Sequence, residues 1–343
     1  MPYKNVVILK NDATGDLVHS MEAIYNIIKN KDVQNVTIFI SRMSKKFAFL
    51  INDSKVKIKI LNYDLSFLEK IRLLYFFFIN KFEDVYILAP KNFYYFLPII
   101  FFKTKFHAIC INNINNYRRP SNFLRKFLYN YKVNDRSAIF KRESSALLQM
   151  KLTSTKSITK KEIKIEPSVS ENLKKYLPKD YFYFHLRKKR LDELGWGISE
   201  LSLLFNEFLK YSKNVVLTKD IELDENTKIL KDNFNSFDFK SLSYINKSKK
   251  IIFLDNIDGE DLYNVIRLSK KVIAFHGMIP SLASINKVSV LELFHCNIKN
   301  WNDYRNYRNA FYEFKPNYKN HSFIIPNRNI KKSIKKMKFA LVK

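Results

Sequence analysis

Residues 6–28 read VVILKNDATGDLVHSMEAIYNII, and their pattern indicates the fold class of the chain. The apolar run at 6–9 predicts a short buried strand, and the polar residues 10–15 that follow it predict a loop. From residue 17 onward the apolar side chains recur every three or four positions, which is the spacing of one helix face. The stretch therefore predicts a strand, a loop and a helix, in that order.

The same alternation of apolar runs and helix-length segments continues along the chain. Further strands are predicted at 36–40, 56–60, 85–88, 106–111, 181–186, 214–218, 251–254, 271–275 and 288–293. Helical patterns lie between them, notably at 199–211 and 261–269. Such alternation predicts parallel sheets covered by helices. The sequence is therefore expected to form an α/β protein with two Rossmann-like domains that face one another across a cleft, where open α/β sheets bind ligands.

A change in composition marks the boundary between the two predicted domains. Residues 151–180 are rich in Ser, Thr and Lys, contain two prolines and show no strong periodicity, which is typical of a linker. We predict an N-terminal domain at 1–150 and a C-terminal domain at 181–325. A basic amphipathic helix is predicted at 326–343.

Length and composition exclude several classes of protein. The chain has 343 residues, of which 46% are hydrophobic, enough to form two cores and too many for global disorder. Its two cysteines exclude a disulfide scaffold or a cysteine zinc site, and its six histidines show no metal-ligand spacing. We expect no metal and no cofactor.

No segment is predicted to cross a membrane. The most apolar stretches, 71–79 and 93–102, have about half of the ~20 residues that a membrane-spanning helix needs. The first ten residues lack the long apolar run and the cleavage site of a signal peptide. The protein is therefore expected in the cytoplasm.

A strong positive charge points to anionic partners. The 61 Lys and Arg residues against 32 Asp and Glu residues leave a formal charge of +29. Two segments, 117–132 and 330–341, are both basic and amphipathic. The cations of the first segment include Arg118, Arg119, Arg125 and Lys126. These segments would contact an anionic acceptor or a membrane surface; alternatively, each apolar stripe packs on its own domain and the cations are solvated.

The loop after the first strand contains a glycine and an aspartate side by side. Gly15 is one of only five glycines in the chain. It either lets backbone N–H groups approach a ligand or supplies a tight turn. Asp16 lies at or near the start of the predicted helix, where it either faces the cleft as a functional group or has a structural role as an N-cap or first-turn aspartate. The spacing alone leaves both alternatives open.

Residues 6–24 resemble the opening of the family 9 glycosyltransferases, the lipopolysaccharide heptosyltransferases. That family has an apolar strand, a short polar loop, Gly-Asp, two apolar residues, then Thr or Ser and usually Pro-Ala; here Glu22 stands in place of the proline. The resemblance implies that Asp16 is the catalytic base. We expect Gly15 to contact the nucleotide sugar, and Lys10 to contact the acceptor or the membrane.

The second half of the chain resembles the same family more weakly. Three stretches are similar to its nucleotide-binding segments: 181–189, 215–222 and 272–283. The residues expected to bind the nucleotide sugar are Arg187, Lys188, Lys189, Glu222, His276, Gly277 and Ser281. The family usually has Asp, Thr or Ser, Gly, two residues and His in the last segment, whereas this chain has histidine at the aspartate and serine at the histidine. This departure lies in the expected donor site, so the resemblance does not fix the identity of the donor.

Physical chemistry favours the same positions. A nucleoside diphosphate leaving group develops negative charge, so its site needs fixed cations or helix N-termini. Arg187 and the lysines after it follow a strand of the buried type, and Pro280, after His276 and Gly277, is a favoured first residue of a helix. The alternatives are a solvated loop in a lysine-rich protein and a histidine that is merely hydrogen-bonded.

The resemblance implies a fold of the GT-B type and an inverting, metal-independent glycosyltransferase. The C-terminal domain would bind a nucleoside diphosphate sugar similar to ADP-heptose. The N-terminal domain would bind a lipopolysaccharide core or another anionic glycan or glycolipid, at the inner face of the cytoplasmic membrane. One alternative is a nucleic-acid-binding protein, which the charge would suit but for which no motif is present, so that no nucleic acid is expected. The other is a relative that has lost catalysis.

Overall fold

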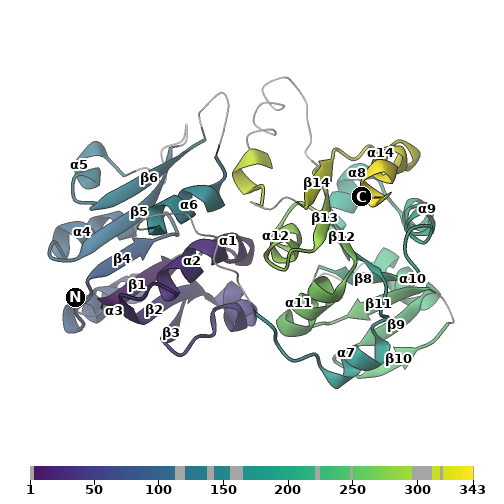
Figure 1. The fold of residues 1–343 in the computed structure, drawn as a ribbon, viewed down its shortest axis with the longest axis horizontal. Helices are drawn as coiled ribbons and strands as arrows, with labels where there is room; N and C mark the ends of the chain where they lie inside the picture. The colour runs from purple at the N-terminus through teal and green to yellow at the C-terminus, as the bar shows by residue number, and fades with distance from the viewer. Residues whose placement is uncertain are drawn as a thin grey trace. The chain divides into compact units, whose positions relative to one another are not determined.

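A computed structural model of the chain describes residues 4–112, 120–136, 143–154, 165–220, 225–247, 250–295, 311–316 and 320–342. The chain forms two compact units (Figure 1). The first comprises Met1–Ile165 and Tyr304–Asn317, and the second comprises Glu166–Asp303 and Tyr318–Lys343. The break after residue 165 lies within the predicted linker. The segment Tyr304–Asn317 differs from the prediction, because it belongs to the first unit although it lies within the domain expected at 181–325.

The first unit is built on a parallel six-stranded sheet. The strand order is β3-β2-β1-β4-β5-β6. The strands are β1 (Lys4–Lys10), β2 (Val33–Ser41), β3 (Val56–Leu61), β4 (Asp84–Ile87), β5 (Lys105–Asn112) and β6 (Asn130–Asp135). The order reverses between β1 and β4, which makes their carboxyl ends the switch point where such sheets bind ligands.

Helices cover both faces of this sheet. They are α1 (Thr14–His19), α2 (Met21–Ile28), η1 (Arg42–Ile51), α3 (Phe67–Ile79), η2 (Asn92–Phe96), α4 (Leu97–Ile100), α5 (Asn122–Arg125) and α6 (Ser145–Thr153). Residues 311–314 are also helical. The predicted first helix is divided at Ser20, whose hydroxyl donates to the carbonyl of Asp16 at 2.8 Å. Such a bond from Ser to the carbonyl four residues earlier often bends a helix.

The basic amphipathic segment 117–132 is not one continuous helix. Its described part contains only the four-residue helix α5 and the start of β6, which pairs with β5 in parallel. The leucines at 124 and 128 are buried in the core that lies on one face of the sheet. The two leucines therefore pack on their own unit, whereas the aromatic side chains of Phe123 and Tyr129 are exposed. Pairing with β5 satisfies the backbone of the strand.

The second unit is built on an eight-stranded sheet with the order β10-β9-β11-β8-β7-β12-β13-β14. Its strands are β7 (Phe182–Leu186), β8 (Val215–Lys219), β9 (Asn235–Asp238), β10 (Ser243–Ile245), β11 (Ile251–Asp255), β12 (Lys271–Phe275), β13 (Ser289–Leu293) and β14 (His321–Ile324). Only β10 is antiparallel to its neighbour. The predicted α/β class with two Rossmann-like domains is confirmed.

The helices of the second unit include the predicted C-terminal helix. They are α7 (Glu171–Tyr176), α8 (Lys188–Leu194), α9 (Ile198–Phe208), α10 (Glu225–Asn233), α11 (Gly259–Leu268), α12 (Met278–Ile285) and α14 (Ile330–Val342). Ile330, Met337 and Leu341 of α14 lie in the core of the second unit. The apolar stripe of this helix therefore packs on its own domain, and the predicted separate segment 326–343 is part of the second unit. Among the described residues, no helix is both long enough and apolar enough to span a bilayer.

Candidate functional site

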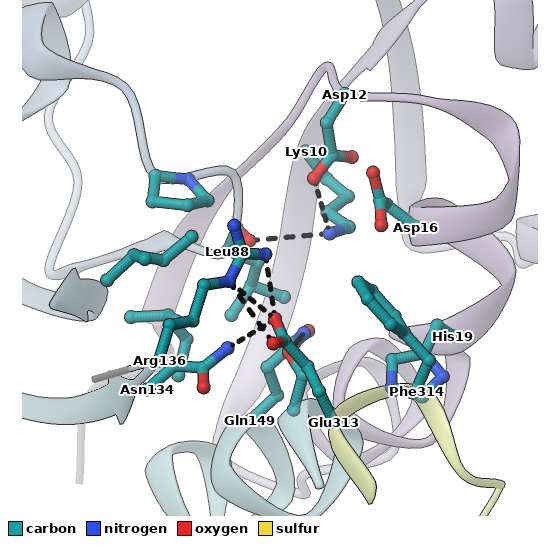
Figure 2. Close-up of a pocket in the computed structure, with 14 residues that line it drawn as sticks. Lys10, Asp12, Asp16, His19, Leu88, Asn134, Arg136, Gln149, Glu313 and Phe314 are labelled. Atoms are coloured by element: carbon teal, nitrogen blue, oxygen red, sulfur yellow. Dashed lines mark hydrogen bonds and ion pairs between the residues drawn. The ribbon is translucent and has the colours of Figure 1, made fainter. Parts of the chain in front are cut away.

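A pocket in the first unit opens at the switch point of the sheet (Figure 2). It is lined by Lys10, Asp12, Asp16, His19, Leu88, Pro90, Ile109, Ile111, Asn134, Arg136, Ser145, Gln149, Glu313 and Phe314. The carboxyl end of β1, the loop after it and helix α1 supply one part of the lining, and the residues after β4 together with β5, β6, α6 and residues 311–314 supply the rest. Ionisable side chains from distant parts of the sequence therefore meet in one place.

The loop between β1 and α1 is held by an asparagine. The side-chain amide of Asn11 donates to the carbonyl of Asn62 at 2.7 Å, and its oxygen accepts from the hydroxyl of Tyr94 at 2.6 Å. Asn11 and Tyr94 are both fully buried. These bonds fix the backbone on which the neighbouring acidic residues stand.

A buried ion pair lies in the pocket. The ammonium of Lys10 is 2.7 Å from Oδ2 of Asp12 and also donates to the carbonyl of Leu88 at 3.3 Å. Lys10 is only 2% exposed. Of the two roles predicted for Lys10, contact with a membrane surface is therefore wrong, because the side chain lies inside the pocket. Contact with an acceptor stays a prediction.

Asp12 is a candidate that we did not predict from the sequence. Burial raises the pKa of Asp12 to about 6; the charge of Lys10 acts in the opposite direction, and that of Asp16 adds to the rise. Its Oδ1 atom is buried and has no hydrogen-bond partner among the described residues. The sequence signal was an acid two positions after a lysine at the end of a buried strand.

Asp16 projects into the pocket beside Lys10 and Asp12 (Figure 2). It is half-buried in the first turn of α1, whose N-cap is Ala13. Within the described part of the chain, its carboxylate makes no hydrogen bond. Asp16 is therefore not the N-cap, but it is the first-turn aspartate that the structural alternative also allowed, and the helix dipole favours an acid in this turn.

Gly15 is part of the helix α1 and does not form a turn with positive φ. Of the two alternatives for this glycine, the tight turn is not seen. Its expected contact with the nucleotide sugar stays a prediction.

An ion pair between distant residues forms another part of the pocket lining. The guanidinium of Arg136 donates to Glu313 through Nε at 2.9 Å and through Nη2 at 2.7 Å, and the amide of Asn134 donates to the same carboxylate at 2.8 Å. Glu313 is buried and lies 177 residues from Arg136 in the sequence. No local pattern could have predicted this pair, because its partners come together only when the segment Tyr304–Asn317 joins the first unit.

His19 has a structural role in the pocket lining. Its Nε2 accepts a hydrogen bond from the backbone N–H of Ala146 at 3.1 Å, in the first turn of α6. An imidazole nitrogen that accepts this bond is not protonated. In the described residues, no three His, Cys, Asp or Glu side chains are grouped so that they could hold a metal ion. Metal independence stays a prediction.

In the second unit, Arg187 connects two helix N-termini. It follows β7 directly, is the N-cap of α8, and donates from Nη1 to the backbone carbonyl of His276. Arg187 is half-buried, and burial lowers its pKa from the usual value. The polar loop predicted after this strand is instead the helix α8, which begins at Lys188.

Position 277, next to the guanidinium of Arg187, requires a glycine. Its φ of 152° lies in the region that side chains rarely adopt, and a Cβ atom there would lie 3.0 Å from Nη1 of Arg187. Gly277 is the N-cap of α12, so it gives the guanidinium access to the start of that helix.

The two helices beside Arg187 begin without a side-chain cap. Neither α8 nor α12 has a side-chain hydrogen bond at its N-cap, whereas Ser170 caps α7 and Asp258 caps α11. Uncapped N–H groups at helix N-termini favour anions. The arrangement is therefore suited to bind a phosphate group.

The basic residues of the first turn of α8 differ in their surroundings. Lys188 lies 3.0 Å from Asp192, Arg190 lies 2.6 Å from Glu193, and Lys189 is exposed. Cations at the positive end of a helix dipole are locally unfavourable. Such conflicts between a local rule and the sequence are typical of functional sites.

The imidazole of His276 is held by a buried glutamate. Nδ1 of His276 and Nε2 of His321 lie 2.5 Å and 2.6 Å from the two oxygens of Glu292. Burial acts to raise the pKa of Glu292, but the hydrogen bonds from the two histidines outweigh it and hold the pKa below its usual value. The alternative of a hydrogen-bonded structural histidine is therefore seen, and the backbone carbonyl of His276 is the group that contacts Arg187.

The remaining predicted site residues are dispersed or lie outside the described residues. Ser281 is buried within α12. Arg125 lies over the ring of Tyr131, 5.7 Å from its centroid, and Lys126 is exposed at the end of α5. Glu222, Arg118 and Arg119 lie outside the described residues.

Comparison with known proteins establishes the fold. No family model matches the sequence, and no curated protein matches it. The E. coli ADP-heptose lipopolysaccharide heptosyltransferase II is 9% identical, with 98% of both chains covered and a TM-score of 0.64. A glycosyltransferase family 9 protein from Veillonella parvula is 10% identical, with 99% of this chain and 98% of that chain covered and a TM-score of 0.66. The chain has the fold of these glycosyltransferases.

This fold is also found in another class of nucleotide-sugar enzyme. The UDP-GlcNAc 2-epimerase of Methanocaldococcus jannaschii is 15% identical, with 99% of this chain and 93% of that chain covered and a TM-score of 0.53. The GT-B type fold expected from the resemblance is thus confirmed. The argument for a particular activity depends on the residues of the two units.

Proposed function

We propose that the protein is an inverting glycosyltransferase that moves a sugar from a nucleoside diphosphate to a glycan hydroxyl. One observation carries the proposal: the carboxylate of Asp16 makes no hydrogen bond within the described part of the chain and lies in a pocket at the switch point of the first sheet. The fold shared with a heptosyltransferase supports it.

Asp16 would act as the general base. As the acceptor oxygen attacks the anomeric carbon, the carboxylate takes the hydroxyl proton, and the bond from that carbon to the diphosphate breaks with its electron pair on the leaving oxygen. Attack on the face opposite the leaving group inverts the configuration of the sugar.

Asp12 would keep Asp16 available for this step. Lys10 forms its ion pair with Asp12, at 2.7 Å. A lysine paired with Asp16 instead would stabilise the ionised carboxylate and weaken it as a base. We therefore assign Asp12 and Lys10 as positioning residues.

Arg187 and the starts of α8 and α12 would bind the diphosphate. A guanidinium can donate two parallel hydrogen bonds to phosphate oxygens, and helix N–H groups add further donors. These groups stabilise the charge that develops as the glycosidic bond breaks. They would allow transfer without a metal ion.

We propose the donor from the comparison with a solved structure and the acceptor from the net charge of this chain. The E. coli protein of the same fold is described as an ADP-heptose lipopolysaccharide heptosyltransferase, and we propose an ADP-heptose-like donor for this chain. The formal charge of +29 suits an anionic lipopolysaccharide core or similar glycolipid as the acceptor.

The experiment that tests this function is the replacement of Asp16 by Asn. The amide keeps the shape of the side chain but cannot take a proton, so we expect kcat for transfer from ADP-heptose to core-deficient lipopolysaccharide to fall by about 100-fold or more. The affinity for ADP should not change. The control is Asp64→Asn, which alters an exposed aspartate. Transfer by the Asp16 variant within a few-fold of the wild type would overturn the assignment.

A further inference from the structure

Helix α3 is apolar on both of its sides. Its inner residues Leu73 and Phe77 lie in the core of the first unit. Its outer residues include Phe67, Tyr75 and Phe78, which are 75%, 64% and 69% exposed. An ordinary surface helix carries polar residues on the side that faces water. The outer side of α3 is therefore suited to a partner rather than to water.

The apolar surface continues beyond α3. Phe102, just after α4, is 76% exposed, and Phe123 of α5 is 61% exposed. The ring of Phe78 packs against Phe101 with centroids 5.0 Å apart, and the buried residues of all three helices share one core. Figure 1 shows α3, α4 and α5 in succession along one side of the first unit. We call their outer side, with Phe67, Tyr75, Phe78, Phe102 and Phe123, the apolar face.

Exposed cations accompany the apolar face. Arg72 lies on α3, Lys81 and Lys103 follow α3 and α4, and Lys126 ends α5, all of them exposed. Most acidic side chains near the apolar face are already paired with groups of the first unit. Glu69 forms the capping box of α3, Asp84 is bound by Lys4 and His107, and Glu83 accepts from the backbone N–H of Asn5. Asp64 remains exposed before α3.

We propose that the apolar face docks the protein on an anionic lipid bilayer. Aromatic rings together with Lys and Arg are the side chains that suit the boundary between acyl chains and anionic headgroups. A second copy of this chain fits less well, because a two-fold contact would bring these cations against themselves. Three short helices that lie on a folded sheet rest on the bilayer and do not span it.

The proposal deepens the proposed function, since a surface that holds the protein on a bilayer brings it to a glycolipid acceptor. It can nevertheless be tested separately. Binding to lipid vesicles requires neither donor nor acceptor, so failure of docking and failure of transfer are distinguishable.

The test is co-sedimentation of the full chain with vesicles of phosphatidylcholine, with or without about 30% phosphatidylglycerol. The variant Phe67→Ser, Tyr75→Ser and Phe102→Ser removes three exposed rings that form no ring pair among the described residues. The matched control, Phe339→Ser and Val342→Ser on α14, removes two apolar side chains that are 71% and 74% exposed. We expect the wild type and the control to bind the anionic vesicles, and the triple variant to lose about tenfold or more in partitioning.

Two further measurements guard against a folding defect. Thermal unfolding of the triple variant should match the wild type, because exposed rings contribute little to the core. A Phe102→Trp variant should shift its fluorescence to the blue on addition of anionic vesicles, in excess of any change in the wild type.

Four results would overturn the proposal. These are unchanged binding by the triple variant, loss of binding by the α14 control instead, absence of wild-type binding to anionic vesicles, and no excess blue shift from Phe102→Trp. Dimerisation that the triple variant abolishes would assign the apolar face to a second copy. RNA binding abolished by the same variant would assign it to nucleic acid.

Discussion

Two neighbouring aspartates in the pocket of the first unit have different surroundings. Asp12 is buried and paired with Lys10, whereas Asp16 is half-buried and makes no hydrogen bond within the described residues. The charge of Asp16 contributes to the raised pKa of Asp12. These surroundings match the proposed roles, in which Asp12 holds the ammonium of Lys10 and Asp16 acts as the base.

The raised pKa of Asp12 predicts an acid limit to activity. Below about pH 6 the carboxyl is protonated and Lys10 loses its partner, so we expect kcat to fall as the pH drops through about 6. The free energy of unfolding depends on pH in the opposite direction to kcat. A carboxyl with a raised pKa in the folded state binds its proton more tightly there, so its ionisation costs stability above about pH 6, and this cost disappears as the pH falls.

A pH–rate profile and thermal unfolding measured over the same pH range check this prediction. In Asp12→Asn the acid limb near pH 6 should be absent, although the overall rate is lower. An acid limb that is unchanged in this variant would show that another group titrates.

Gly277 predicts a specific effect on nucleotide binding. In Gly277→Ala the new Cβ would meet Nη1 of Arg187 at 3.0 Å, so we expect the guanidinium to shift and the affinity for ADP to fall about tenfold, the loss of one good charged hydrogen bond. Calorimetric titration with ADP measures the effect. The control is Gly195→Ala, which also has positive φ but no atom within 4 Å of the added Cβ. Equal losses in the two variants would mean that backbone strain, not the contact with Arg187, is responsible.

The sequence predicted those site residues that lie in local motifs. Asp16 and Gly277 stand next to strand ends and could be recognised from a few neighbouring residues. Arg136 and Glu313 could not, because their partnership depends on a segment that returns from far along the chain. The hydrogen bonds that hold His276 could not be predicted either, because Glu292 and His321 lie on other strands.

At the scale of elements, the predictions succeeded where strands are buried on both faces. The central parallel strands are continuous apolar runs, such as β1 and β12, whose core positions are almost fully buried. Among the strands that were not predicted, β9, β10 and β14 have only three or four residues, too few for a pattern. The strand β6 was also missed, because only two of its six residues, Tyr131 and Val133, are apolar. In the segment 117–132, the buried leucines at 124 and 128 have the spacing of a helix face, although a strand begins at Asn130.

The segment Tyr304–Asn317 is attached to the first unit by a carboxylate, which yields a stability prediction. Glu313→Gln removes the charge that faces Arg136 while keeping the shape, so we expect a loss of about 1–3 kcal/mol in the free energy of unfolding. Urea unfolding measures it. The control, Glu171→Gln, breaks an exposed pair with Lys174 and should change stability by less than about 0.5 kcal/mol. Equal effects of the two changes would contradict the role of Glu313.

At the scale of the whole molecule, the two units supply different chemistry. The pocket of the first unit offers carboxylates, one of them without a hydrogen bond in the described residues, which suits proton removal from a hydroxyl. The second unit offers an arginine and two uncapped helix N-termini, which suit a diphosphate. Glycosyl transfer to a hydroxyl needs both kinds of site.

The most direct test of this account is the release of ADP from ADP-heptose, measured with and without core-deficient lipopolysaccharide. We predict release only when the acceptor is present, with one glycosylated acceptor formed per ADP, and its loss in Asp16→Asn while ADP still binds. Release of nucleotide without acceptor, or conversion of the sugar while it remains attached to the nucleotide, would contradict a glycosyltransferase.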